Sequence, residues 1–245
     1  MRRNARATAT RTLRRAVTWK PKRAGTERLD VAALISPLRY DVLVRAEFFS
    51  FLETRPSGES PEALVGAAWD EPYAVWFREV AMARFRPWVL EDPDLMASSF
   101  QERVLASAAL LKSFSDNGFD PRCPVTLRVT EGLRTSDTGV QVARTVHVGD
   151  GGHRLALLLH SGTDLMPGMY RLDPRPMPLI DNTSVLLRSL DVDQDEYLRF
   201  LAPRYTDRPC EDIASLREAV ADDAALLAEL DSVLAVHGAV TRSEP

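Results

Sequence analysis

The sequence predicts an α+β fold in which a short β-rich core lies between two helical segments. Apolar residues recur at helical spacing before residue 120 and after residue 182, whereas the interval between them is rich in valine, threonine and glycine. The chain has 245 residues, of which 45% are hydrophobic and 27% are charged, the composition of a globular protein. No apolar run approaches the roughly 18 residues that a membrane-spanning helix needs.

Three helices are predicted in the first half of the chain. The first lies within residues 29–56, where five apolar residues share one helix face: Val42, Leu43, Ala46, Phe49 and Leu52. Residues 57–71 are predicted to form a loop, and helices are predicted at Pro72–Phe85 and Leu95–Ser115. Five aromatic residues of this half are predicted to belong to the core: Trp69, Trp76, Phe77, Phe85 and Trp88.

The β-rich interval is predicted to contain three strands and one short helix. These elements are Cys123–Val129, Val140–Val148, the helix His153–Ser161, and Met166–Leu172. Residues 130–139 are rich in turn-forming types, and the three prolines within residues 173–182 predict a loop. Further helices are predicted at Thr183–Leu190, Gln194–Leu201 and Glu211–Val236.

These elements divide the chain into five parts. They are a mobile basic arm at 1–28, a helical extension at 29–109, the core at 110–175, a second helical extension at 176–237 and a tail at 238–245. The arm has a net charge of +9 and the rest of the chain −13, which gives −4 in total. A solvated arm is the simplest interpretation, and contact with an acidic partner or an anionic membrane is the alternative. The acidic body argues against specific DNA binding.

Cysteine content restricts the kinds of site that the chain can form. Only Cys123 and Cys210 are present, which excludes a disulfide scaffold and any four-cysteine metal site. So few cysteines are typical of a reducing compartment, and we expect a cytoplasmic protein.

The segment Val146–Gly162, VHVGDGGHRLALLLHSG, carries the clearest chemical signal. A strand runs into a glycine-rich turn and then directly into a helix, whose first turn presents unpaired N–H groups that favour phosphate. Gly149, Gly151 and Gly152 would let the backbone approach an anion closely. The alternative interpretation is a tight strand–helix connection without a ligand.

Three further side chains of this loop can act on a bound phosphate. Arg154 can add a bidentate donor, and His153 can act as a second cation or as a proton carrier. Asp150 can hold a magnesium ion that bridges phosphate oxygens.

The order of these elements around Gly-Asp-Gly-Gly-His-Arg resembles the core of the ParB/sulfiredoxin-like superfamily. The preceding GFDPRCPVTLRV resembles the entry into that core, and the resemblance covers about Leu110–Leu172. It implies a small mixed sheet. Sulfiredoxins carry a catalytic cysteine where Gly152 stands, and chromosome-partitioning ParB proteins carry a Gly-Glu-Arg-Arg-type box, so the motif is most similar to the Asp-Gly-X-His-Arg form of the free-serine kinases.

The resemblance implies a nucleotide site at this loop. Phosphates of ATP or ADP, with CTP as a further candidate, would be held by Gly149, Gly151, Gly152, His153 and Arg154. Asp150 would lie close to the transferred phosphoryl group or to its Mg²⁺, and both Asp150 and His153 are candidate catalytic residues.

A kinase also needs groups that bind and activate an acceptor. Candidates lie in the segment Arg39–Glu47, where Asp41 and Arg45 are four residues apart and share a helix face. These two are candidate substrate-binding residues, and Glu47 is a candidate catalytic carboxylate. The alternative is that Asp41 and Arg45 form an ordinary surface ion pair and that Glu47 likewise has no role in the site.

Two functions therefore remain open from the sequence. The first is a nucleotide-dependent phosphotransferase acting on a small hydroxyl-bearing metabolite. The second is a non-catalytic nucleotide-binding switch or accessory protein that docks on a protein partner. A ParB-like DNA-associated protein is a distant third.

Overall fold

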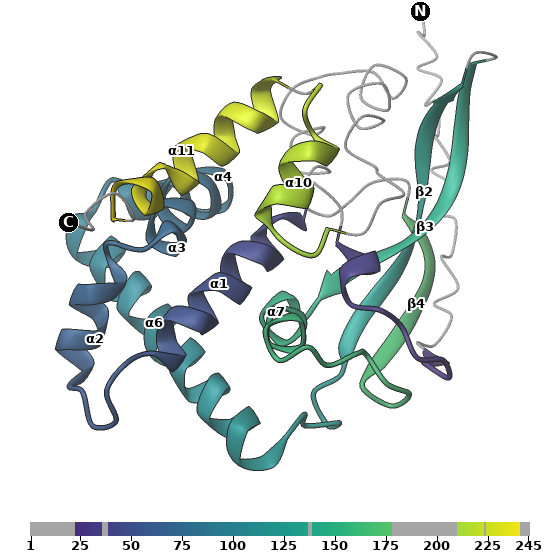
Figure 1. Ribbon diagram of the computed structural model, residues 1–245. Coiled ribbons are helices and arrows are strands. Elements are labelled where there is room, and N and C mark those ends of the chain that lie inside the picture. Colours follow the sequence, from purple (N-terminus) through teal and green to yellow (C-terminus); the bar gives the residue numbers. More distant parts are fainter. Residues whose placement is uncertain (1–22, 36–38, 137–138, 178–209, 223, 241–245) are drawn as a thin grey trace, which may run out of the picture.

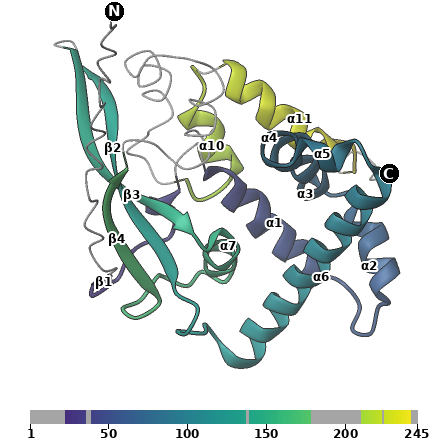
Figure 2. The same cartoon turned by 180° about the vertical axis from the view of Figure 1, so that it is seen from behind.

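The structure is a computed structural model, and it describes residues 23–35, 39–136, 139–177, 210–222 and 224–240. It is a mixed α/β fold with a four-stranded mixed sheet in the described part, and the described helices lie to one side of that sheet (Figures 1 and 2). Most of the basic arm, the tail from residue 241, and the predicted helices Thr183–Leu190 and Gln194–Leu201 lie outside the described residues.

The sheet has the order β1-β4-β2-β3. Its strands are β1 (Arg23–Ala24), β2 (Val125–Ser136), β3 (Gly139–Asp150) and β4 (Tyr170–Met177). The central strand β2 pairs antiparallel with β3 and parallel with β4, so Leu127 lies opposite both Val148 and Leu172. The connection from β3 to β4 contains α7 (Gly152–His160), which packs between the sheet and α1 (Asp41–Glu53).

The remaining helices are η1 (Ala32–Leu34), α2 (Pro61–Ala68), α3 (Pro72–Val75), η3 (Trp76–Met82), α4 (Ala83–Phe85), α5 (Pro87–Leu90), α6 (Pro93–Asn117), α10 (Ile213–Ala219) and α11 (Ala224–Val240). Of these helices, α3 and α6 pack directly against α1. Local signals define several ends: the Asp92 carboxylate caps α6 and Ser60 caps α2, while Gly118 ends α6 with a positive φ. Among the described helices, none is long and apolar enough to cross a membrane.

One hydrophobic core connects the sheet with the helices. Leu127 of β2, Leu155 of α7, Phe49 of α1 and Phe100 of α6 are all buried in it, and Leu216 of α10 extends it toward the C-terminal end. Segments 29–109 and 110–175 therefore pack as parts of the same core. Residues 23–28, which the sequence assigns to the mobile arm, begin in the sheet, because Arg23 and Ala24 pair with β4.

Several predicted elements differ from the structure. The loop predicted at 57–71 contains the helix α2, because Ser60 and Pro61 form a helix start. The helix predicted at Pro72–Phe85 has those ends, but its middle seven residues form the π-helix η3. The turn-rich segment 130–139 is mostly strand, since β2 and β3 continue as a paired ribbon.

Three further differences lie later in the chain. The third strand begins at Tyr170 rather than at Met166 and continues through Pro174 and Pro176 into the predicted loop. The predicted helix Glu211–Val236 is divided into α10 and α11. Phe85 and Trp88 are not core residues, since they are 39% and 56% exposed.

Candidate functional site

The site is built around the first turn of α7. Strand β3 ends at Asp150, Gly151 turns the chain with φ +94°, and the helix begins at Gly152. A Cβ atom on Gly151 would lie 3.3 Å from the Cα of Val125, so both the conformation and the close packing favour glycine. No side chain caps this helix start, and its first N–H groups therefore remain available to an anion.

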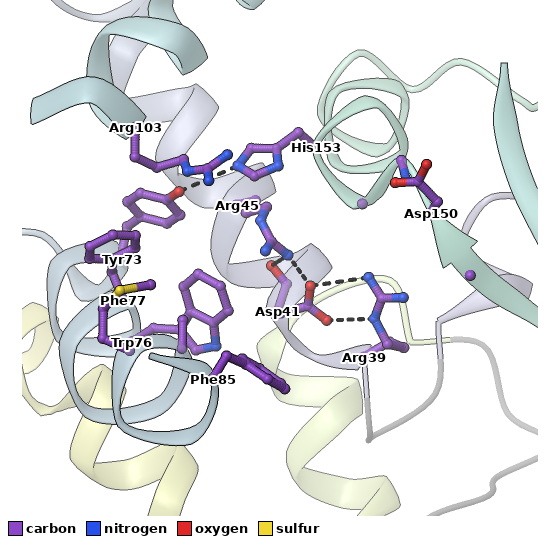
Figure 3. A pocket seen from close by; sticks show the side chains of 15 residues that line it. Arg39, Asp41, Arg45, Tyr73, Trp76, Phe77, Phe85, Arg103, Asp150 and His153 are labelled. Carbon is purple, nitrogen blue, oxygen red and sulfur yellow. Dashed lines mark hydrogen bonds and ion pairs between the residues drawn. The ribbon is translucent and has the colours of Figure 1, made fainter. Parts of the chain in front are cut away.

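This helix start opens into a pocket of about 330 Å³ (Figure 3). Residues from α1 and the segment just before it, from α3, η3, α4 and α6, and from the β3–α7 turn surround it. The lining residues are Arg39, Asp41, Arg45, Tyr73, Trp76, Phe77, Ala81, Met82, Phe85, Arg103, Gly149, Asp150, Gly151, Gly152 and His153. The pocket thus combines a cationic side with an aromatic side.

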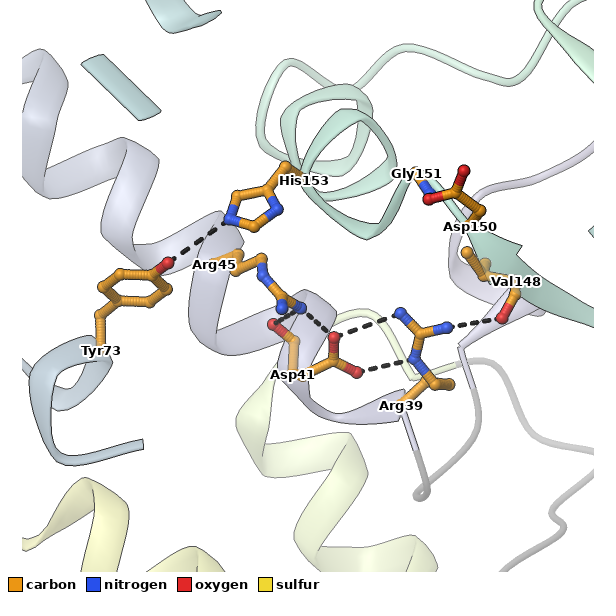
Figure 4. Close-up of polar contacts among 8 residues, drawn as sticks. All are labelled: Arg39, Asp41, Arg45, Tyr73, Val148, Asp150, Gly151 and His153. Carbon is orange, nitrogen blue, oxygen red and sulfur yellow. Dashed lines mark hydrogen bonds and ion pairs between the residues drawn. The ribbon is translucent and has the colours of Figure 1, made fainter. Parts of the chain in front are cut away.

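A buried arginine–aspartate network forms the floor of the cationic side (Figure 4). Arg39 Nε donates to Asp41 Oδ1 at 2.8 Å, and its Nη1 donates to the Val148 carbonyl at 2.5 Å. Arg45 Nη1 donates to the other carboxylate oxygen of Asp41 and to the Asp41 carbonyl. Both carboxylate oxygens of Asp41 are therefore engaged by guanidinium groups.

Positive charge exceeds negative charge around this network. The buried Nε of Arg45 has no hydrogen-bond partner among the described residues, and the guanidinium lies 4.5 Å from the centroid of the Trp76 ring. Burial lowers the pKa of Arg45 to about 10, and the nearby cations Arg39 and Arg103 add to this shift. Within the described part of the chain, the Arg103 guanidinium makes no hydrogen bond or ion pair. A bound anion would supply the hydrogen-bond acceptors and the negative charge that Arg45 and Arg103 lack.

His153 contributes a neutral ring to this environment. Its Nε2 lies 3.4 Å from the hydroxyl of the buried Tyr73. Burial, followed by the surrounding guanidinium groups, lowers the pKa of His153 to about 2, and burial raises the pKa of Tyr73. The imidazole is therefore uncharged at physiological pH.

Asp150 is the exposed acidic group of the pocket. Its Oδ1 accepts the Gly151 N–H at 2.7 Å, and the residue lies on the side opposite Tyr73 (Figure 3). The described residues contain no group of three or more His, Cys, Asp or Glu side chains that could hold a metal ion. A Mg²⁺ ion at Asp150 would thus take most of its ligands from phosphate and water, as this ion commonly does.

The structure brings together most of the residues that the sequence singles out. Gly149, Asp150, Gly151, Gly152, His153, Asp41 and Arg45 all line the pocket. Arg154 does not line it, because its guanidinium donates to the carbonyls of Cys123 and Pro124. Glu47 lies instead in a second pocket, between α1, α7 and α10, with Ser50 and His160.

Sequence reasoning missed three residues that belong to the site. Arg39 and Arg103 supply positive charge, and Tyr73 contacts His153. The local sequence around Arg103 and Tyr73 offers no signal for this role, because both residues reach the pocket only through helix packing. Arg39 is the first residue of the segment Arg39–Glu47, where the sequence predicts substrate-binding and catalytic candidates, and this position is the one indication of its role.

Comparison of the chain with known protein families, with curated proteins and with solved structures finds no significant match in any of the three.

Proposed function

We propose that the pocket binds the phosphate groups of a nucleotide, ATP or ADP with CTP as a further candidate, and that the protein is a phosphotransferase acting on a small hydroxyl-bearing metabolite. One observation carries this proposal: the uncapped first turn of α7 faces Arg39, Arg45 and Arg103 in one pocket. Backbone N–H groups and guanidinium groups are the donors that phosphate prefers.

The arrangement of β2, β3, α7 and β4 also supports the resemblance to the ParB/sulfiredoxin-like superfamily. The Gly-Asp-Gly-Gly-His-Arg motif occupies the junction of β3 with α7, and β4 follows parallel to β2. We propose that these elements form a core of that type, to which the helices around α1 and α6 are additions.

The proposed transfer joins the acceptor hydroxyl oxygen to the terminal phosphorus of the nucleotide while the bond to the leaving phosphate oxygen breaks. The hydroxyl proton passes to the Asp150 carboxylate, since Asp41, the other carboxylate lining the pocket, is held by Arg39 and Arg45. Arg45 and Arg103 would stabilise the charge on the phosphate oxygens. A Mg²⁺ ion bound to the phosphates near Asp150 would neutralise part of the same charge.

Calorimetric titration with ATP, ADP and CTP in the presence of Mg²⁺ tests the binding step. We expect Arg103→Gln to weaken binding about 10-fold or more, because it removes a charge-assisted donor. Arg171→Gln is the matched control, since Arg171 is exposed on β4 and does not line the pocket. Absence of nucleotide binding to the wild type, or equal losses in both variants, would contradict the proposal.

Turnover separates the enzyme from the second candidate, a non-catalytic nucleotide-binding switch. One observation favours that second candidate. Guanidinium groups hold both carboxylate oxygens of Asp41, so among the described pocket residues only the exposed Asp150 carboxylate is left to act as a base. Phosphorylation of serine or of another small hydroxyl compound, lost in Asp150→Asn, would support the phosphotransferase. Binding without turnover for a panel of such compounds would favour the switch.

A further inference from the structure

The contact between Tyr73 and His153 joins two elements that are far apart in the sequence. Tyr73 belongs to α3 and is 1% exposed, while His153 is the second residue of α7 and lines the pocket. The Tyr73 hydroxyl lies 3.4 Å from Nε2 of the imidazole (Figure 4). Figure 4 shows Nδ1 turned away from Tyr73, toward the α7 side of the pocket.

The groups around this pair define the charge of the imidazole. The charged and titratable residues that line the pocket or act on His153 are Arg39, Asp41, Arg45, Tyr73, Arg103, Asp150 and Arg154. Four of them are guanidinium groups, and the one buried carboxylate already bridges two of these. An imidazolium would be a further cation beside these guanidinium groups, which is costly, so the ring is neutral when no anion is bound.

Hydrogen bonding then defines which ring nitrogen carries the proton. A neutral imidazole has one donor and one acceptor nitrogen, whereas guanidinium groups can only donate. The buried Tyr73 phenol keeps its proton, because burial raises its pKa. The Tyr73 hydroxyl can donate or accept, whereas the guanidinium groups near Nε2 can only donate, so an acceptor at Nε2 suits all of these neighbours. Nδ1 would then carry the hydrogen.

We propose that His153 donates a hydrogen bond to a bound phosphate from a neutral ring through Nδ1–H, and that Tyr73 is the positioning residue that holds this tautomer. This inference rests on the proposed phosphate site and assigns its histidine a role other than cation or general base. A neutral donor can stabilise the negative charge that develops on the phosphate oxygens without transferring its own proton.

Nitrogen-15 NMR of the histidine rings tests the tautomer in the full-length protein without ligand, and the His153→Asn variant identifies the His153 signals. We expect His153 to keep one unprotonated nitrogen at Nε2 and not to titrate between pH 5 and 8. In Tyr73→Phe, we expect the signals to report a mixture of tautomers. Titration of His153 in the wild type, or a proton on Nε2, would overturn the proposal.

Affinity for ADP, measured by calorimetry, tests the role of the donor. The amide nitrogen of asparagine occupies nearly the place of Nδ1, whereas that of glutamine reaches toward the place of Nε2. We expect His153→Asn to bind ADP within about 3-fold of the wild type and His153→Gln about 10-fold more weakly, the loss of one hydrogen bond to a charged group. Equal losses in the two variants would contradict the proposed donor.

A double-mutant cycle assigns the role of Tyr73. We expect Tyr73→Phe to weaken ADP binding in the wild type and to have no further effect in His153→Asn, because the amide needs no tautomer. An equal effect in both backgrounds would indicate that Tyr73 acts only on the packing. If ADP fails to bind at all, the proposed function fails, while the NMR result still decides the tautomer.

Discussion

Arg154 has a structural role, although its place in the motif suggests phosphate binding. Its side chain extends from the first turn of α7 to the carbonyls of Cys123 and Pro124, just before β2. Side chains of a helix lean toward its N-terminus, which directs this one to the strand entry rather than into the pocket. Two carbonyl groups of an irregular segment are satisfied in this way.

We therefore expect Arg154→Gln to affect stability more than ligand binding. Loss of hydrogen bonds from a charged donor should lower the free energy of unfolding by about 1–3 kcal/mol. The affinity for ADP should stay within about 3-fold of the wild type. Urea denaturation and calorimetry measure the two quantities, and a large loss of affinity at unchanged stability would return Arg154 to the phosphate site.

The contrast between Arg154 and Arg103 shows which site residues a sequence can reveal. The glycines and His153 are predictable, because a glycine-rich strand–helix junction is a local pattern with a local function. Arg103 lies within an otherwise ordinary helix, and Tyr73 belongs to a segment with aromatic residues typical of a core. Their roles depend on the packing of α3 and α6 against α7, which local patterns do not encode.

At the scale of the elements, the absence of a side chain at Gly152 leaves room for two guanidinium groups beside the first turn of α7. A Cβ atom on Gly152 would lie 2.9 Å from Nη2 of Arg39 and 3.5 Å from Nη1 of Arg45. The nearest atoms are the ends of side chains, so a methyl group there displaces guanidinium groups rather than backbone. Gly152 thus allows Arg45 of α1, and Arg39 just before α1, to lie against the first turn of α7.

We expect Gly152→Ala to fold and to bind ADP about 10-fold more weakly, because the displaced arginines would no longer reach the proposed phosphate position. Gly66→Ala is the matched control: Gly66 is in α2, and a Cβ atom there has no neighbour within 4 Å. That variant should be more stable by about 1 kcal/mol, as alanine favours a helix, with unchanged affinity. Calorimetry and denaturation compare the two, and unchanged affinity in Gly152→Ala would refute the proposed contact.

The elements were predictable where their signals are local. The long helix α6 begins at Asp92-Pro93 and ends at Gly118, so its prediction was nearly complete. The sequence predicts β2 and β3 too short, because Gly132 and its neighbours are turn-forming residue types. Their pairing with Ala143 and adjacent residues is a contact across the hairpin, which a local pattern does not encode. The π-helical turns of η3 have no established sequence pattern and were not foreseen.

At the scale of the whole molecule, the pocket is a cationic site in an acidic body. The chain beyond residue 28 carries a net charge of −13, whereas the pocket concentrates Arg39, Arg45 and Arg103. An acidic surface disfavours nonspecific anion binding, and a recessed cationic pocket attracts small anions. This distribution fits a small phosphate-bearing ligand better than a nucleic acid, whose backbone needs an extended basic surface.

Burial of His153, together with these nearby cations, makes the stability of the protein depend on pH. The pKa of His153 is lowered to about 2 in the folded state, from an ordinary value of 6.5. Below pH 6.5 the unfolded chain therefore binds a proton that the folded chain does not, so this residue destabilises the fold progressively as pH falls. Carboxylates with lowered pKa, such as those of Glu59 and Asp120, act only at lower pH.

As pH falls from about 7.5 to about 5.5, protonation of His153 in the unfolded chain should lower the free energy of unfolding by about 1.4 kcal/mol. His153→Asn has no titrating group at this position, so its stability should change less over the same range by about that amount. Urea denaturation without ligand, at both pH values and for both proteins, measures the difference. Parallel changes in the two would mean that His153 takes up its proton in the folded state, and the charge assigned to the pocket would then be wrong.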